Sequence, residues 1–240
     1  MEDSRTAAAR THFDRWSHTY ERGRGAARLQ GVQTAAVAAL ALYRDDALLD
    51  LGCGTGAAVR QAAPLVRRAV GFDLSPAMIA QARNLAAGIG NVDFREGDVS
   101  GPLPFADGEF TAIVCTTAFH HFPKPLDTIA EMARVLAPRG RVVIADANRR
   151  HPAVFVFDLA LRRLQRSHVG FRSPTQLMRD LCAAGFADAS MCTIGGLSYA
   201  FVRGEKPGPL TPSETMPNLT RHKARHAQWT AGPVDPRHRR

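Results

Sequence analysis

The sequence predicts an α/β fold, in which a doubly wound, mostly parallel sheet carries helices on both faces. From residue 47 to 147 short apolar runs alternate with segments of helix-forming composition, as expected for successive strand–helix–strand units. The first apolar run ends in three glycines at alternate positions, Gly52, Gly54 and Gly56. Glycines there let the backbone turn tightly and approach a bound molecule, because no Cβ stands in the way.

Two helical stretches are expected before the sheet. Phe13, Trp16 and Tyr20 recur at helical spacing within residues 5–22, a Gly-Arg-Gly break follows, and residues 29–42 are alanine-rich. Strands are expected near residues 47–51, 69–73, 92–95, 110–116 and 141–146, and helices at about 55–67, 76–87 and 125–137. We expect residues 1–45 to form an N-terminal helical cap on a domain that spans residues 46–203.

An insertion at residues 148–173 is expected after the fifth strand. Val154, Phe157, Leu161 and Leu164 recur there at helical spacing. Packing against the sheet and a lid over an apolar acceptor are both open interpretations. A helix at 174–184 and two strands near 187–194 and 197–203, joined at Gly195-Gly196, would complete a seven-stranded sheet.

Composition is that of a soluble globular protein, with 45% hydrophobic and 22% charged residues in a chain of 240. We expect a cytoplasmic location, because no signal-like segment or long apolar run is present. The four cysteines show no CxxC spacing, so neither a metal site nor a disulfide is predicted.

The net charge of +9 does not by itself predict a nucleic-acid partner. Residues 204–240 hold seven basic and three acidic residues, and the other 24 basic and 19 acidic residues are spread over the rest of the chain. No basic stripe is interleaved with aromatic residues, so a solvated surface is the favoured interpretation. The proline-containing tail, residues 204–240, is expected to be basic and disordered, with Trp229 as a possible anchor.

Two acidic residues indicate which class of ligand the glycine turn could bind. Asp50 lies within the first strand, where a carboxylate would oppose a pyrophosphate and favour a cationic ligand. Asp73 ends the second strand, where an acid accepts hydrogen bonds from ribose hydroxyls in doubly wound sheets. S-adenosylmethionine combines a ribose with a positively charged sulfonium and ammonium, so it fits both positions.

Five motifs in order resemble those of class I S-adenosylmethionine-dependent methyltransferases, with a Rossmann-like seven-stranded sheet whose last strand is antiparallel. They are Asp50-Leu-Gly-Cys-Gly-Thr-Gly56, Gly71-Phe-Asp-Leu-Ser-Pro76 with Met78, Gly97-Asp98, Leu103 to Phe110, and Leu136 to Arg141. Within that superfamily the chain is most similar to the small-molecule methyltransferases of ubiquinone and menaquinone biosynthesis, over roughly residues 10–203.

The resemblance implies a set of cofactor-binding residues: Asp50, Gly52, Cys53, Gly54, Gly56, Asp73, Leu74, Met78, Asp98, Val99, Thr116 and Tyr20. Asp98 would accept from the adenine amine, with a turn-forming role as the alternative. Met78 would pack near the adenine or ribose, with simple helix burial as the alternative. No metal ligands are implied.

The end of the fourth strand, Cys115 to Phe122, is expected to face both the methyl group and its acceptor. His121 and His120 are the candidate bases there, because histidine titrates near neutrality, although the pair could only shape the pocket. The Asn/Asp-Pro-Pro-aromatic run of base-methylating enzymes is absent at this point, which argues against a nucleic-acid acceptor.

The leading hypothesis is methyl transfer from S-adenosylmethionine to carbon or oxygen of a small apolar or aromatic acceptor by in-line displacement. A non-catalytic cofactor-binding regulatory module and an RNA or protein methyltransferase are the alternatives. A base is required only if the acceptor must lose a proton. The sequence does not specify the acceptor or the oligomeric state.

Overall fold

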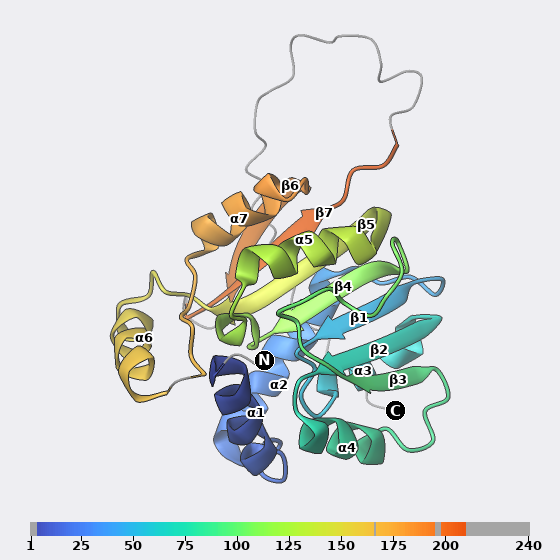
Figure 1. Cartoon of the computed structure of the whole chain (residues 1–240). Helices are drawn as coiled ribbons and strands as arrows, with labels where there is room; N and C mark the ends of the chain where they lie inside the picture. Colours follow the sequence, from blue (N-terminus) through green and yellow to red (C-terminus); the bar gives the residue numbers. More distant parts are fainter. Residues whose placement is uncertain (1–3, 166, 195–197, 210–240) are drawn as a thin grey trace, which may run out of the picture.

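One sheet with the strand order β3-β2-β1-β4-β5-β7-β6 forms the centre of the molecule (Figure 1). The computed structural model describes residues 4–165, 167–194 and 198–209. Strands β1 to β5 pair in parallel, whereas β7 runs antiparallel to both β5 and β6. The predicted fold class, including the antiparallel last strand, is confirmed. The strands are β1 Ala47–Leu51, β2 Arg68–Asp73, β3 Val92–Glu96, β4 Phe110–Thr116, β5 Leu136–Ala147, β6 Ala187–Ile194 and β7 Tyr199–Glu205.

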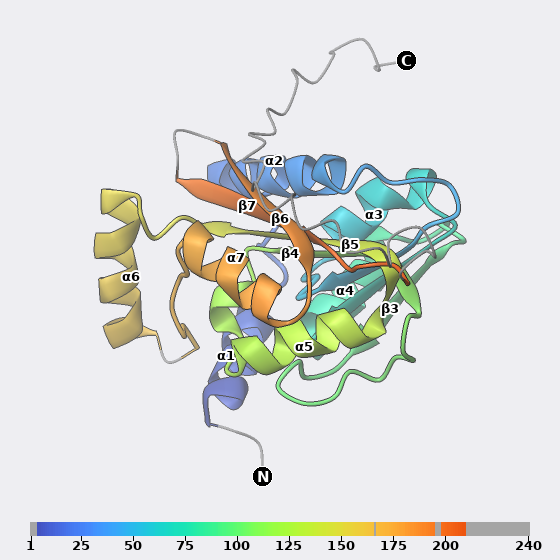
Figure 2. The ribbon, with the colours of Figure 1, turned by 90° about the horizontal axis from the view of Figure 1, so that it is seen from above.

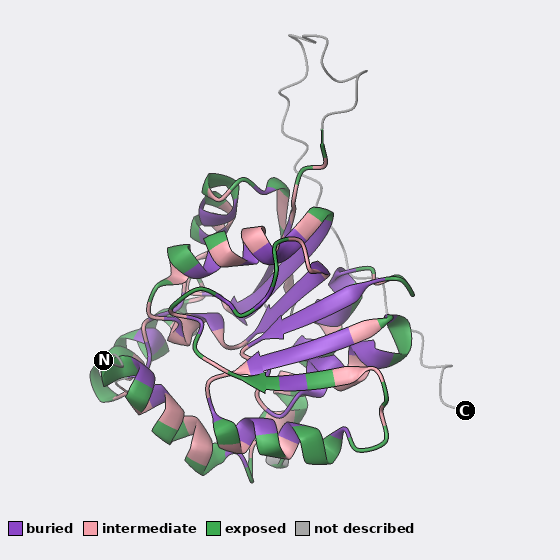
Figure 3. Cartoon of the chain, turned by 45° about the vertical axis from the view of Figure 1, so that its right-hand side comes forward, coloured by how far each residue is buried: buried purple, intermediate pink, exposed green. Residues whose placement is uncertain are grey.

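Helices cover both faces of this sheet (Figure 2). They are α1 Ser4–Trp16, α2 Gly23–Ala39, α3 Ala57–Ala62, α4 Pro76–Leu85, α5 Pro125–Val135, α6 Pro152–Leu164 and α7 Pro174–Ala183, with 3-10 turns η1 Ala63–Leu65 and η2 Phe119–His121. Leu48 packs with α2, α3 and α4, whereas its neighbour Leu49 packs with α5 and α7 on the opposite face. Because successive strand residues point to opposite faces, β1 is buried on both sides (Figure 3).

Helix α4 shows why its sequence begins a helix where it does. Ser75 caps the helix, since its Oγ accepts a hydrogen bond from the Met78 backbone at 3.1 Å. Pro76 follows at the first helical position, where the missing N–H costs nothing. This cap fixes the chain that leaves the end of β2.

The element boundaries differ from the sequence expectation at several points. Helix α2 begins at Gly23, so the expected break is part of the helix. Strand β5 begins at Leu136, which pairs with Phe110 before a register shift. Strand β7 continues to Glu205, two residues beyond the expected end. The expected turn at Gly195-Gly196 and the tail with Trp229 lie outside the described residues.

Helix α6 lies at the edge of the molecule in both views, and not against the sheet (Figures 1 and 2). Among its described residues Asp158 alone is buried. Its carboxylate accepts hydrogen bonds from Arg149, Arg162 and the Phe171 backbone. Through Arg149 and Phe171 these contacts join α6 to the segments that precede and follow it. No helix in the described part of the chain is long and apolar enough to cross a membrane.

Candidate functional site

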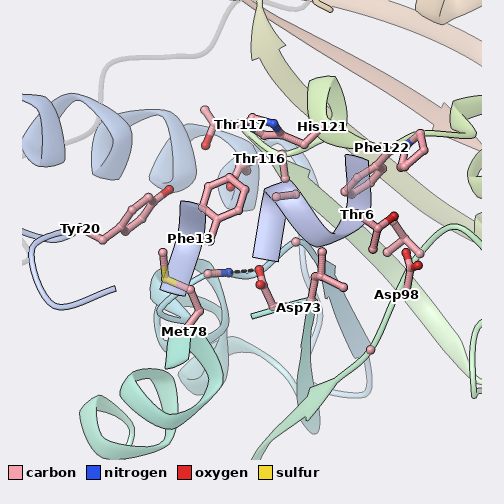
Figure 4. Close-up of a pocket in the computed structure, with 18 residues that line it drawn as sticks. Thr6, Phe13, Tyr20, Asp73, Met78, Asp98, Thr116, Thr117, His121 and Phe122 are labelled. Carbon is pink, nitrogen blue, oxygen red and sulfur yellow. Dashed lines mark hydrogen bonds between the residues drawn. The ribbon is translucent and has the colours of Figure 1, made fainter. Parts of the chain in front are cut away.

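A pocket opens at the carboxyl ends of β1, β2, β3 and β4, where open α/β sheets bind their ligands (Figure 4). Among the predicted cofactor residues, nine line it: Tyr20, Gly52, Gly54, Asp73, Leu74, Met78, Asp98, Val99 and Thr116. The candidate base His121 also lines it. Tyr20 and Asp98 lie at opposite ends of the pocket, with Asp73 between them (Figure 4).

Asp73 holds the glycine turn to the end of β2. Its two carboxylate oxygens accept hydrogen bonds from the backbone nitrogens of Gly54, at 2.8 Å, and Ser75, at 2.9 Å. Each carboxylate oxygen has a further lone pair, so both remain able to accept from a ligand hydroxyl. Burial raises the pKa of Asp73, which the two backbone hydrogen bonds partly offset.

Asp50 lies beneath the glycine turn and does not line the pocket. Its side chain is buried, and its Oδ1 has no hydrogen-bond partner in the described part of the chain. Burial, with the nearby Asp73 carboxylate, raises the pKa of Asp50 to about 8. An unpaired buried carboxylate is costly, so the site favours a cationic ligand group close to Asp50.

The glycines of the turn differ in what they do. Gly52 has a φ of +73°, and a Cβ there would lie 2.5 Å from the Ala118 Cβ. Gly54 has a φ of +52° and faces the Tyr20 ring. Gly56 faces Phe94 and does not line the pocket, so its glycine serves packing between the turn and β3.

Cys53 also lies outside the pocket lining. Its Sγ faces Gly71, where a Cβ would come within 2.7 Å. Burial raises the pKa of the Cys53 thiol well above its usual value. Cys53 therefore packs the glycine turn onto β2, and only its backbone can face a ligand.

Asp98 makes the turn-forming contact that the sequence left as the alternative, and it also lines the pocket. Its Oδ1 accepts a hydrogen bond from the Ser100 backbone at 2.8 Å, which is a turn-forming contact. The same side chain lines the far end of the pocket. Met78 is likewise both buried in α4 and part of the lining.

Residues of α1 close the pocket from above. Thr6, Ala9 and Phe13 line it at helical spacing, and they leave a free volume of only about 70 Å³. Asp14 ties α1 to α4, because its carboxylate accepts from the Ser75 hydroxyl at 2.5 Å. Three side chains of α1 thus form one wall of the pocket. Phe13 belongs to the predicted aromatic set, whereas Thr6 was not predicted, and only the helical spacing could have indicated it.

A second cavity, of about 1130 Å³, lies between α1, α6 and the ends of β4 and β5. Apolar residues of α6 form one wall, and polar groups at the strand ends include His120 and Asp146. The two hollows share four lining residues, which are Phe13, Tyr20, Thr117 and His121. His120 thus lies in the cavity and not in the first pocket.

Thr117 and Phe122 line the pocket and belong to the segment, Cys115 to Phe122, that was expected to face the site, although neither was named as a site residue. Thr117 has a φ of +51°, a conformation that costs energy for a β-branched residue, directly at the end of β4. Its backbone nitrogen donates to the Ala145 carbonyl at 2.8 Å, which holds this turn on β5. No sequence signal marks a non-glycine residue with positive φ.

The residues present fit S-adenosylmethionine. The buried unpaired oxygen of Asp50 suits the positive charge of the methionine arm, and Asp73 suits a ribose. Gly52 and Gly54 leave space that a side chain would fill. When bound, this molecule supplies an electrophilic methyl group on a positively charged sulfur.

The strand order and this site at the glycine turn define a Rossmann-like domain of the class I methyltransferase type. Residues 49–144 match the family model described as a methyltransferase domain. Residues 49–144 are therefore similar to a methyltransferase domain, as the resemblance of their motifs implied, and such a domain would take S-adenosylmethionine as its cofactor.

Several of the curated relatives are methyltransferases of quinone biosynthesis. The chain is 33% identical over 154 residues to the demethylmenaquinone methyltransferase of Tropheryma whipplei (strain Twist), a match covering 63% of each chain. It is 29% identical over 181 residues to the ubiquinone biosynthesis O-methyltransferase of Aromatoleum aromaticum, covering 72% of this chain and 73% of that protein. The match to the first relative thus spans less than two thirds of that protein's length.

A solved structure shows the same fold. The complex of the Haloferax volcanii Trm112 methyltransferase activator with a putative methyltransferase gives a TM-score of 0.73. The superposition has 22% sequence identity and covers 84% of this chain and 99% of that chain. At that identity the likeness concerns the fold alone.

Proposed function

We propose that this chain transfers the methyl group of S-adenosylmethionine to a small apolar or aromatic acceptor. The observation that carries the proposal is the shared wall between the pocket and the larger cavity, formed by Phe13, Tyr20, Thr117 and His121. A donor in the pocket and an acceptor in the cavity would meet there. The names of the curated relatives support an acceptor of the quinone-precursor kind.

The donor is bound in this proposal by groups from four strand ends. Asp73 accepts hydrogen bonds from the ribose hydroxyls, and Asp50 accepts a hydrogen bond from the ammonium group of the methionine arm. Asp98 and Val99 contact the adenine ring. The glycines Gly52 and Gly54 let the backbone approach the donor closely. Met78, Thr116 and Tyr20 complete the walls of the pocket.

The chemistry needs alignment more than an unusual catalyst. The chain would hold the acceptor atom in line with the methyl carbon and the sulfur, and exclude water. Orientation of this kind contributes up to about 7–11 kcal/mol in favourable cases. His121 and His120, which line the cavity, are the candidate bases for an acceptor that must lose a proton.

In this proposal two segments close the site, one over the donor pocket and one over the acceptor cavity. Residues 1–45, with α1 over the pocket, would act as an N-terminal cap that opens to admit the donor. Residues 148–173, with α6 along one wall of the cavity, would act as a lid on the acceptor. Residues 46–203 would form the catalytic domain, and residues 204–240 a basic tail.

Transfer of a radiolabelled methyl group tests the proposal. The full chain is incubated with labelled S-adenosylmethionine and separate panels of phenols, quinols and thiols, and label in the organic phase is measured. Transfer to at least one panel is expected from the wild-type chain and from Asp107→Ala, whose side chain is 82% exposed. With the donor below its Kd, transfer by Asp73→Ala should be about 10–150-fold lower. Binding of S-adenosylhomocysteine without any transfer would instead favour the non-catalytic module, and transfer to RNA or protein alone would favour the third hypothesis.

A further inference from the structure

Asp146, at the end of β5, holds the side chain of His120 in a fixed position. The Nδ1 atom of His120 lies 2.9 Å from each of the two carboxylate oxygens of Asp146. The same carboxylate accepts hydrogen bonds from the backbone nitrogens of His120, at 3.0 Å, and Ala147, at 2.8 Å. The Asp146 carboxylate thus accepts from two backbone N–H groups and from the His120 ring, and these contacts fix the orientation of both side chains. The two residues follow or end the adjacent strands β4 and β5.

This contact decides which nitrogen of His120 is available. A carboxylate only accepts, so Nδ1 carries the proton, and Nε2 of the neutral ring carries the lone pair. In the described part of the chain no hydrogen bond engages Nε2, and the His120 side chain is 11% exposed where it lines the larger cavity. The basic nitrogen is thus on the side of the ring away from Asp146.

His121 lacks such a partner. Its Nδ1 lies 2.8 Å from the Ser167 carbonyl oxygen, and a neutral carbonyl stabilises an imidazolium less than a carboxylate does. Burial, with the neighbouring His120 ring, lowers the pKa of His121 well below its usual value of 6.5. His121 is therefore a weaker base than a histidine paired with a carboxylate.

Other charged and titratable groups around His120 come from several elements. Its ring centroid lies 4.0 Å from that of His121 in η2 and 5.3 Å from that of His168, which precedes α7. The same cavity is also lined by His12, Arg15, Tyr20, Arg28 and Tyr199. Asp146 is the only carboxylate among the described residues that line this cavity, so it is the group that can stabilise a proton on the His120 ring.

We propose that His120 is the catalytic base of the methyl transfer and that Asp146 is its positioning residue. The inference rests on the proposed function and narrows its acceptor to an aromatic ring carrying an ionisable hydroxyl, as in a phenol or hydroquinone. Nε2 takes the hydroxyl proton, and the ionised acceptor forms the new bond to the methyl carbon. The carbon–sulfur bond breaks with its electron pair on sulfur, and the imidazolium held by Asp146 later releases the proton to water.

Ionisation of a bound phenol gives a readout that needs no turnover. The probe is 4-nitrophenol, whose ionised and neutral forms absorb at different wavelengths, bound to the full chain together with S-adenosylhomocysteine. At one pH unit below the probe's own pKa, wild-type protein should bind it mainly in the ionised form, whereas His120→Gln should bind it neutral. Asp146→Asn should shift the ionisation of the bound probe to higher pH, and the exposed His18→Gln should leave it unchanged.

Kinetics provide the second readout. His120→Gln is expected to lower the kcat/KM for phenol methylation by about 10²–10⁴-fold, the usual contribution of a general base. Transfer to thiophenol, which is ionised at pH 8 without a base, should change less than about threefold in the same variant. In Asp146→Asn, the acidic limb of the plot of kcat/KM for phenol methylation against pH should move to a different pH. If Asp146 had only a structural role, the position of this limb would not change.

Several results would overturn the assignment while leaving methyl transfer intact. These are a neutral probe in the wild-type complex, no binding of the probe, or wild-type phenol methylation by a folded His120→Gln. An equal loss of phenol and thiophenol methylation would also oppose it. The wild-type spectrum needs no variant, so the proposal stays testable if the variants do not fold. Loss of all transfer in the wild-type chain would instead contradict the proposed function itself.

Discussion

The Oδ2 atom of Asp73 lies 2.8 Å from the backbone nitrogen of Gly54, so the end of β2 fixes the glycine turn that follows β1. Asp50, in β1 just before this turn, is also buried. Two acids from neighbouring strands therefore flank the glycine turn.

Replacing Asp73 by Ala should weaken binding of S-adenosylhomocysteine by about 1.5–3 kcal/mol, the range for hydrogen bonds to a charged group. The variant removes both the acceptor of the ribose and the contact that holds Gly54. Isothermal titration calorimetry on the folded variant measures the loss. As a control, Asp93→Ala removes an exposed carboxylate paired with Arg95 and should bind as the wild type does. Unaltered affinity in Asp73→Ala would refute the ribose assignment.

Gly52→Ala should destabilise the protein and impair donor binding. Its φ of +73° is unfavourable for alanine, and the added Cβ would lie 2.5 Å from that of Ala118. A loss of about 1–3 kcal/mol in the free energy of unfolding is expected from such overpacking and strain. Gly101→Ala is the matched control, since nothing lies within 4 Å of its added Cβ. Equal unfolding midpoints in urea for the two variants would contradict the prediction.

Asp50 should make the folded protein less stable as the pH rises, whereas most acidic residues have the opposite effect. Its pKa in the folded chain is about 8, above its ordinary value of 3.8, so the folded state binds the extra proton between these two values. The contribution of Asp50 to the free energy of unfolding should therefore fall as the pH rises from about 4 to about 8, and level off above. Urea denaturation across this range, compared with Asp50→Asn, measures that contribution. A difference between the two proteins that does not change with pH would disprove the raised pKa.

Donor binding should release a proton from Asp50 below pH 8. The cationic arm favours the ionised carboxylate, so the affinity for S-adenosylmethionine should rise as the pH approaches 8. Calorimetry in buffers of different ionisation enthalpy detects the released proton. The release should disappear in Asp50→Asn, and a wild-type chain that releases none would count against the contact.

Arg141→Met should be among the most destabilising substitutions outside the site. Arg141 pairs with the buried Asp46 and donates to the carbonyl oxygen of Ala41 at 2.9 Å. Removing Arg141 leaves the buried Asp46 carboxylate without its counter-charge, and breaking a buried ion pair in this way costs about 3–5 kcal/mol. Arg68→Met breaks the partly exposed pair with Glu109 and should cost about 1 kcal/mol or less. Urea denaturation of both variants tests the ranking.

The sequence predicted the parts of the molecule in which local pattern and tertiary structure agree. The apolar run at Leu48 and the capped helix at Ser75 each carry a signal within a few residues. The contact of Asp146 with His120 spans 26 residues and two strand ends, and no local pattern contains it. The positive φ of Thr117 is likewise imposed by the fold. Long-range side-chain pairing therefore limits what a single sequence can specify about this site.

A crystal structure of the chain with S-adenosylhomocysteine would show whether the two acids hold the donor. We predict that the ribose hydroxyls lie within hydrogen-bond distance of the Asp73 carboxylate and that the ammonium group lies beside Asp50. We also predict that α1 is displaced outward from its position here. A ligand bound elsewhere, or a ribose with no contact to Asp73, would contradict these predictions.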